Sequence, residues 1–408
     1  MQRVRDDAQH KIRNMQHATC NTRHVLRIAC FVLLLAACQV PGSVRPTVKV
    51  GLVAPFEGRY RYVGYDVIYA VRLALREANA AGGVGGYSVE LVAYDDGADP
   101  AMAVQQARKL AVDPDVIAAI GHFREETTAV ALSAYAEAGM PLVAPGVLDP
   151  ALTRGDAQGP RAYRLGPVAD ALAHALLDRL DQLGHRQAAL VTEGGPLGAA
   201  LRRNAQPGRL RLWPVVSPQG TEPQDAEWLE QVRASGAQAV FCDAGPVVAG
   251  EVVTALREAG WQGTFLGGPQ LAAADFVAVA GQAAEGAVFV TPWPFPADEA
   301  AAADFAAAAD FAAAYQRVSN GLPPGPLAAP AYEATWVLLE ALQRDIAAHG
   351  VPTREGIAAA LPATSREGVL GLIAFDADRS WGDAPLYSYR IGAEGLPTPI
   401  NGYSATRR

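Results

Sequence analysis

Short apolar runs alternate with longer segments of helical spacing over most of the chain. The first run, Val48–Ala54, is mostly apolar and is typical of a buried strand. Residues 63–81 then repeat apolar side chains at helical spacing and end at Gly82 and Gly83, where a helix terminus is expected. The alternation continues through strands at 87–93, 116–120 and 142–144 and helices at 101–111 and 127–138. These strand–helix repeats predict a parallel sheet with helices on both faces.

A second series of the same kind follows. It is predicted to begin with a strand at Tyr163–Leu165 and to place further strands at 188–192, 210–216, 239–242 and 264–266, with helices at 169–183, 197–204, 224–234 and 247–259 between them. Two doubly wound units in series indicate two lobes, because a chain of this length exceeds one typical hydrophobic core. Long helical stretches at 300–318 and 331–348 and a strand-rich tail at 369–391 complete the pattern.

The residues before the first strand have the pattern of an export signal. Arg23 and Arg27 precede the apolar run Ile28–Ala37, and small residues lead to Cys38. A basic segment, a short apolar core and small residues are typical of a secretory signal, and a run of roughly ten apolar residues is about half of what a membrane-spanning helix needs. We expect residues 1–37 to be removed and residues 38–46 to form a tether. Translation from Met1 or from Met15 stays open.

Charge and cysteine content narrow the possible partners. Removing residues 1–37 takes away six basic and two acidic residues and changes the formal net charge from −8 to −12. Nucleic acids and anionic membrane surfaces select basic proteins, so neither is an expected partner. Cys20 and Cys30 leave with the signal, so Cys242 has no partner for an internal disulfide if Cys38 is modified. Cys242 lies in an apolar run and is expected to be buried.

The sequence gives no reason to expect an enzyme, a cofactor or a metal site. No catalytic Ser-His-Asp or Cys-His set falls on plausible loops, and the histidines lack metal-ligand spacing. His122 lies at a predicted strand end and is the one histidine singled out by its position. Residues 376–383 resemble a calcium loop, but the glycine is one position late and no glutamate closes it, so a turn is predicted. Residues 82–86 follow a helix, the reverse of the order in a dinucleotide-binding loop.

Several short motifs occur in a fixed order along the mature chain. They are Val50–Gly58, Ala78–Val84, Tyr94–Asp96 with Asp99 and Pro100, Ile120–His122, Gly139–Gly146 with Asp149–Thr153, Ala284–Gly286, Tyr332–Ala334, and Gly368–Gly371 before Phe375 and Asp376. In this order they resemble the type I periplasmic solute-binding proteins, specifically the leucine/isoleucine/valine-binding group of ABC importers. Leu35–Cys38 resembles the bacterial lipobox, in which the cysteine is lipidated and becomes the first residue of the mature protein.

The resemblance implies an α/β fold of two doubly wound parallel-sheet lobes. The chain would cross from one lobe to the other three times, near 163–167, 290–293 and 368–375. Lobe 1 would comprise residues 47–163 and 293–368, and lobe 2 residues 164–292 and 369–408.

In function, the resemblance implies a protein held outside the cell membrane or in the periplasm by lipid on Cys38. It would capture a small solute, an amino acid or a related compound, and deliver it to the permease and ATPase subunits of an ABC importer. A sensory module of the same fold, working with a separate signalling partner, is the alternative. Genes for permeases and ATPases beside this one would favour transport, and a gene for a sensor kinase would favour signalling.

Ligands of open parallel sheets bind outside the carboxyl ends of the strands, which selects the loops 55–64, 121–128 and 145–150. The resemblance implies that Glu125 and Leu148 replace two hydroxyl residues that hold the substrate carboxylate in amino-acid binders. The acid that faces the substrate ammonium corresponds to Pro269 or Gln270, and the tyrosine positions to Val63, Leu197 and the neighbourhood of Pro246. The candidate ligand-binding residues are Tyr62, Val63, Arg124, Glu125, Glu126, Thr127, Gly146, Val147, Leu148, Leu197, Pro246 and Gln270.

These replacements change the expected solute. Glu125 beside a substrate carboxylate would be repulsive, and desolvating that pair in a closed cleft costs several kcal/mol. A neutral, cationic or largely apolar solute therefore fits better than an α-amino acid. In the other interpretation, residues 124–126 are a solvated helix start with acids placed favourably at its N-terminus.

Overall fold

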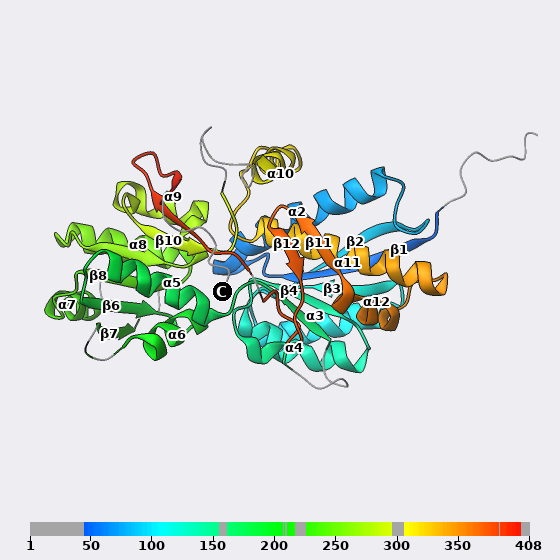
Figure 1. Ribbon diagram of the computed structural model, residues 1–408, viewed down its shortest axis with the longest axis horizontal. Coiled ribbons are helices and arrows are strands. Elements are labelled where there is room, and N and C mark those ends of the chain that lie inside the picture. The colour runs from blue at the N-terminus through cyan, green and yellow to red at the C-terminus, as the bar shows by residue number, and fades with distance from the viewer. Residues whose placement is uncertain are drawn as a thin grey trace, which may run out of the picture. The chain divides into compact units, whose positions relative to one another are not determined.

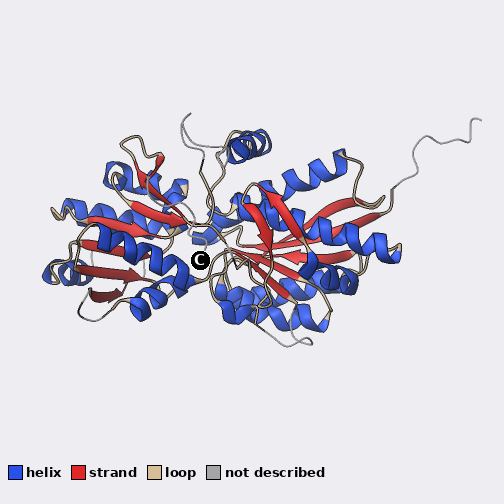
Figure 2. Ribbon diagram, viewed as in Figure 1, coloured by secondary structure: helices blue, strands red, loops and turns tan. Residues whose placement is uncertain are grey.

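The computed structural model describes residues 45–154, 161–206, 208, 210–216, 226–295, 306–382 and 384–400. The predicted signal, Cys38 and most of the predicted tether lie outside the described residues. Residues from Thr47 onward form one compact unit, and the description below concerns this unit. It contains a five-stranded sheet, a seven-stranded sheet and a two-stranded hairpin (Figures 1 and 2).

The first sheet is entirely parallel. Its strands lie in the order β2-β1-β3-β4-β5, with β1 at Thr47–Ala54, β2 at Ser88–Asp95, β3 at Val116–Ile120, β4 at Leu142–Pro145 and β5 at Ala162–Leu165. All residues of β3 and β4 are buried. Burial on both faces explains why these strands read as continuous apolar runs rather than as an alternating pattern.

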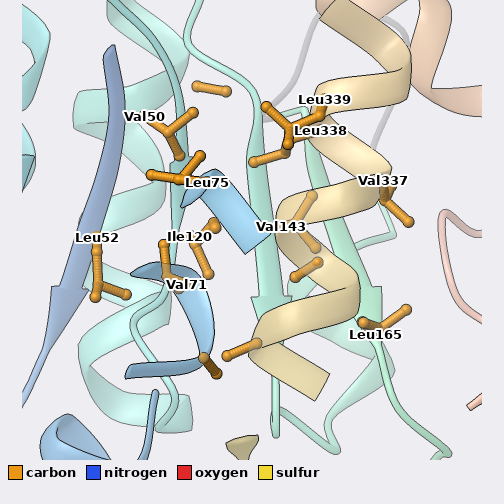
Figure 3. Close-up of a cluster of buried hydrophobic side chains, with 14 of the residues drawn as sticks. Val50, Leu52, Val71, Leu75, Ile120, Val143, Leu165, Val337, Leu338 and Leu339 are labelled. Carbon is orange, nitrogen blue, oxygen red and sulfur yellow. The ribbon is translucent and has the colours of Figure 1, made fainter. Parts of the chain in front are cut away.

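Helices cover both faces of this sheet. Val50 and Leu52 of β1 pack in one cluster with α2 (Arg61–Ala80) and α11 (Ala328–His349), and Figure 3 shows part of this cluster. Val53, which points to the opposite face, packs with α3 (Pro100–Val112) and α4 (Glu125–Glu137). Helix α10 (Ala306–Val318) also contributes side chains to the first cluster. Late segments of the chain therefore complete the core of the first lobe.

The second sheet has the strand order β14-β13-β10-β9-β8-β6-β7. Strands β6 (Gln187–Thr192), β7 (Arg211–Val216), β8 (Ala239–Asp243), β9 (Thr264–Gly267) and β10 (Val288–Thr291) are parallel, whereas β13 (Tyr387–Ile391) and β14 (Pro397–Pro399) pair antiparallel. Helices α5 (Ala169–Gln182) and α6 (Pro196–Asn204) cover one face. Helices α7 (Ala226–Ala234), α8 (Pro246–Glu258) and α9 (Ala274–Ala280) cover the other. The predicted α/β class with two parallel-sheet lobes is confirmed.

Two predicted assignments need correction. The strand predicted at 163–165 was expected to open the second series, but the observed strand β5 pairs with β4, as Leu142 opposite Ala162 shows, and is the edge of the first sheet. The predicted boundary between lobe 1 and lobe 2, at residues 368 and 369, falls inside the hairpin of β11 (Ser365–Gly368) and β12 (Gly371–Ala374) and assigned β12 to the second lobe. Its residues Leu370 and Ile373 instead pack in the first core, as does Trp381. After β10 the chain returns to the second sheet only at β13, because the apolar side chains of the hairpin are buried in the core of the first lobe.

The first and third connections between the lobes are bonded to each other. The backbone N–H of Arg164 donates to Arg379 O at 2.9 Å, and the N–H of Trp381 donates to Arg164 O at 3.0 Å. The buried guanidinium of Arg164 donates to Gly166 O and to Ser380 Oγ, both at 2.7 Å. Two of the segments that join the lobes therefore lie side by side.

Helix α12 (Arg354–Ala360) is fixed to the first sheet by its first residue. The guanidinium of Arg354 donates to the carbonyl oxygens of Val116, Ala138, Ala111 and Asp113 over distances of 2.7–3.2 Å. Two of these carbonyls lie at the carboxyl ends of α3 and α4, where helices leave acceptors without intrahelical partners. Among the described residues, no helix is both long and apolar enough to cross a bilayer.

Candidate ligand-binding site

A cavity of about 150 Å³ lies between loops of the two lobes. The first lobe contributes the loops that follow β1, β3, β4 and β5 and the segment before α11, and the second lobe contributes the loops after β9 and β10. All of the strands concerned present their carboxyl ends, where ligands of open parallel sheets bind. The lining residues are Tyr62, Val63, Phe123, Arg124, Glu125, Gly146, Leu148, Leu165, Gly166, Pro167, Pro269, Gln270, Pro292, Trp293, Pro326 and Leu327.

The structure brings some of the predicted site residues to this cavity and leaves others out. Those that line it are Tyr62, Val63, Arg124, Glu125, Gly146, Leu148 and Gln270. Val147 and Thr127 are buried in the protein beside it. Leu197 packs in the core between α5, α6 and the second sheet, so it does not contribute to the cavity wall. Glu126 is exposed, and Pro246 lines a separate groove at the rim.

Glu125 ties two loops of the first lobe together. It is the first residue of α4, and its Oε1 accepts a hydrogen bond from the backbone N–H of Leu148 at 2.9 Å. Burial raises the pKa of Glu125, and the bond from Leu148 opposes this shift. The backbone N–H of Leu148, in the loop after β4, is therefore already hydrogen-bonded to a protein carboxylate at the cavity wall. Of the two interpretations of residues 124–126, this geometry places Glu125 in the pocket and Glu126 in solvent.

Arg124 stands at the edge of the cavity. Its guanidinium lies over the ring of Tyr60, 3.9 Å from the centroid, and pairs with the exposed Glu126 at 3.3 Å. Tyr60 lines the separate groove that contains Pro246 and does not line the cavity. The guanidinium of Arg124 is therefore stacked on a residue outside the cavity. Such a cation over an aromatic face is stabilised by the ring quadrupole.

An ion pair links the two lobes at the rim. Arg59 Nη1 lies 3.1 Å from Glu193 Oε1, and Glu193 Oε2 accepts from the backbone N–H of Gly245 at 2.8 Å. Arg59 also lies over Tyr60, 4.7 Å from the ring centroid. These residues line the groove of about 510 Å³ that also contains Pro246. Sequence reasoning missed Arg59, Tyr60 and Glu193, although Glu193 follows a predicted strand end.

His122 lies in the core next to the cavity-lining residue Phe123. It is fully buried, with Nδ1 2.8 Å from Asp96 Oδ2 and Nε2 3.0 Å from Tyr135 Oη. Phe123, the next residue, has φ of 68°, in the left-handed region, and lines the cavity. The expectation that His122 lies at a strand end holds, but its side chain belongs to the core under the cavity.

Asp66 positions the segment that precedes α11. Its Oδ1 accepts from Gly325 N and its Oδ2 from Leu327 N, each at 2.7 Å, and the Tyr315 hydroxyl lies 3.4 Å from Oδ1. Pro326 and Leu327 belong to the cavity wall. Burial raises the pKa of Asp66 to about 6, against the opposing effect of these donors. A carboxylate on α2 thus holds one side of the cavity in place.

Gln270 and Trp293, which follow β9 and β10, complete the cavity wall. Gln270 Nε2 donates one of its two N–H groups to Cys242 O at 3.0 Å, which orients the amide, and the amide oxygen is an acceptor. The indole N–H of Trp293 is enclosed by protein and finds no partner among the described residues. Trp293 therefore presents carbon atoms to the cavity.

The cavity has the composition of a small-molecule binding site. It combines apolar and aromatic walls with a few polar groups, which is the usual composition of a small-molecule site. In the described ranges, no group of three or more His, Cys, Asp or Glu side chains is placed to hold a metal ion.

Comparison with known proteins agrees with this geometry. The family model described as "Periplasmic binding protein" matches residues 47–395. The leucine-, isoleucine-, valine-, threonine- and alanine-binding protein of Pseudomonas aeruginosa is 25% identical over 345 residues, which cover 81% of this chain and 86% of that protein. A Leu/Ile/Val-binding protein homolog 2 of Brucella abortus is 25% identical over 63% of this chain and 70% of its own.

Solved structures show the same fold. A leucine-binding protein from Thermotoga maritima superposes with a TM-score of 0.76 at 21% identity, covering 88% of this chain and 99% of that one. A solute-binding protein of an ABC transporter from R. palustris, in complex with benzoate, gives 0.74 at 20% identity, covering 88% and 96%. The family is one of solute-binding proteins rather than enzymes, as expected. The chain therefore belongs to the periplasmic binding protein family and has its type I fold.

Proposed function

We propose that this protein is the lipid-anchored solute-binding component of an ABC importer, which captures a small solute between its lobes and delivers it to the permease. The observation that carries the proposal is the cavity lined from both lobes at the carboxyl ends of their strands. The relatives support it, since those named above are amino-acid-binding proteins or parts of ABC transporters.

The solute is proposed to be neutral, cationic or largely apolar rather than an α-amino acid. The walls include Leu148, Pro269 and Trp293, and a protein carboxylate, that of Glu125, already accepts the N–H of Leu148. A second carboxylate at the same place would be repelled in a partly desolvated pocket.

Binding is expected to stabilise the protein and to bring the lobes together. A ligand at 100 times its Kd adds about 2.7 kcal/mol to the free energy of unfolding, so the melting temperature rises. A thermal-shift screen of amino acids, amides, amines, short acids and aromatic carboxylates identifies the solute, and we expect weak or no shift with leucine, isoleucine and valine. Solution scattering with the solute should then show a smaller radius of gyration. A strong shift with any branched-chain amino acid would contradict the proposed specificity, and unchanged compactness at saturation would contradict the clamp.

Anchoring is expected to depend on Cys38. Cys38→Ala removes the thiol that would carry lipid, so the protein should be left uncut or be released into the soluble fraction. Fractionation of cells, with incorporation of an alkyne-labelled fatty acid, measures this directly. Cys30→Ala, within the predicted signal, is the control and should leave the anchored fraction unchanged. A processed Cys38→Ala protein that stays in the membrane fraction would refute the anchor.

A further inference from the structure

The cavity already contains a carboxylate where a carboxylate-bearing solute would bind. Both Glu125 and Leu148 line the cavity, and the N–H of Leu148 is taken by Glu125 Oε1 at 2.9 Å. A solute carboxylate could use this donor only by displacing Glu125 and then lying against it. Glu125 therefore takes the hydrogen bond from Leu148 N that a solute carboxylate would otherwise accept.

The charge of this carboxylate is only partly balanced, by Arg124, which also lines the cavity. No ion pair within the described part of the chain involves Glu125, and its neighbour Arg124 is stacked on Tyr60 and paired with the exposed Glu126. An ionised carboxylate in a partly desolvated site without an ion-pair partner is costly, and burial raises the pKa of Glu125 against the opposing effect of the Arg124 charge. A cationic solute group at this position would remove that cost.

Gln270 offers a further acceptor to the solute. One N–H of its amide is bound to Cys242 O, and its amide oxygen can accept from a solute donor. Glu125 on the first lobe and Gln270 on the second thus offer acceptors from opposite sides. Tyr62, Phe123 and Trp293 add aromatic walls, which attract cations and pack against branched or flat apolar groups.

We infer that the cavity selects a small primary amine with a branched or aromatic apolar body and no carboxylate, and that Glu125 both holds the ammonium group and excludes carboxylates. This inference rests on the proposed function, because it concerns the solute of the same cavity. The specificity inferred here differs from that of the relatives described above, which bind amino acids.

Matched probes separate the possible ligands. 3-Methylbutylamine is leucine without its carboxylate, 4-methylpentanoate lacks the amine, and 4-methylpentanamide carries neither charge. Titration calorimetry at pH 7 should show binding of 3-methylbutylamine or of its aromatic counterpart benzylamine. Leucine and 4-methylpentanoate should bind at least about tenfold more weakly, since each brings a carboxylate to Glu125.

Two variants of Glu125 test the residue itself. Glu125→Gln keeps an oxygen for the N–H of Leu148 but removes the charge, and it should weaken amine binding about 10- to 100-fold, the usual range for a hydrogen bond to a charged group. Glu125→Ser frees the Leu148 donor and adds a hydroxyl, so binding of 4-methylpentanoate should strengthen at least about tenfold. Glu126→Gln removes the neighbouring exposed charge and should change neither affinity.

Each outcome decides between the proposals. Binding of leucine or of acids but not of amines by the wild-type protein would overturn the inference and leave the transport proposal standing. Amine binding that Glu125→Gln does not change would overturn the role of Glu125. Absence of binding for every compound class would overturn the proposed function as well. Thermal unfolding monitored by circular dichroism verifies that each variant is folded before titration.

Discussion

Glu333→Ala is expected to lower the free energy of unfolding by about 3 kcal/mol. Glu333 of α11 is fully buried; its Oε2 lies 2.7 Å from Arg366 Nε and its Oε1 accepts from Val369 N at 2.6 Å. Breaking a buried ion pair by removing one partner typically costs 3–5 kcal/mol, because the other partner and its neighbours lose their contacts. We expect the lower end of this range, since Arg366 keeps a second partner, Glu340, at 2.9 Å.

Glu340→Ala provides the matched control for this prediction. It removes the partly exposed partner of the same guanidinium, and such pairs contribute up to about 1 kcal/mol. Urea unfolding of both variants and the wild-type protein measures the difference. Arg366 lies on β11 and Val369 in the turn before β12, so Glu333 links α11 to this hairpin. If Glu333→Ala lowers the free energy of unfolding no more than Glu340→Ala does, this link does not stabilise the hairpin.

The contribution of Asp66 to stability is expected to fall by about 3 kcal/mol as the pH rises from 4 to 7. Its pKa is raised from 3.8 to about 6 in the folded protein, so the folded state binds this proton more tightly than the unfolded state. The stabilisation is fully present below about pH 4 and is lost as the pH rises through about 6. The difference between the two pKa values corresponds to about 3 kcal/mol.

Urea unfolding of the wild-type protein and Asp66→Asn at several pH values between 4 and 7 isolates this effect. The other groups titrate in both proteins and cancel in the difference, whereas the asparagine carries no titrating proton. A difference that stays constant, or that rises with pH, would show that the donors from Gly325, Leu327 and Tyr315 outweigh burial and hold the pKa at or below its usual value.

Periodicity predicted most of the elements, though not β10, α9 or α12, and it did not show which sheet each strand joins. The segment at 162–165 is a buried apolar strand, and such a strand fits the edge of either sheet. Leu370 and Ile373 present the same difficulty, because an apolar residue does not indicate which core buries it. The late helices were expected in the first lobe because of the family resemblance, and α10 and α11 do pack there.

The loops of the site were predictable, whereas the directions of their side chains were not. The rule for parallel sheets selected the loops that carry Tyr62, Glu125 and Leu148. The bond from Leu148 N to Glu125 joins residues 23 positions apart and depends on loop conformation, which no spacing reveals. Leu197 opens a helix at a strand end, yet its apolar side chain turns into the core.

Some buried charges did leave a signal. Asp66 falls among the apolar positions of α2, between Val63 and Val67, where an acid is unexpected on a core-facing surface. An acid in such a place must find donors, because an unpaired buried charge is costly. The sequence does not identify the donors themselves, Gly325 and Leu327, which lie about 260 positions away.

The burial of Cys242 makes motion between the lobes accessible to fluorescence. Cys242 is the one free cysteine among the described residues; it lies inside β8, and burial raises the pKa of its thiol. A shielded, protonated thiol reacts poorly with maleimides, so it can stay in place during labelling. Dyes attached through Glu137→Cys on α4 and Arg202→Cys on α6, both exposed, would lie on different lobes of a protein produced from residue 39 onward, which lacks Cys20, Cys30 and Cys38. Energy transfer between them would then follow single molecules as they open and close around a solute.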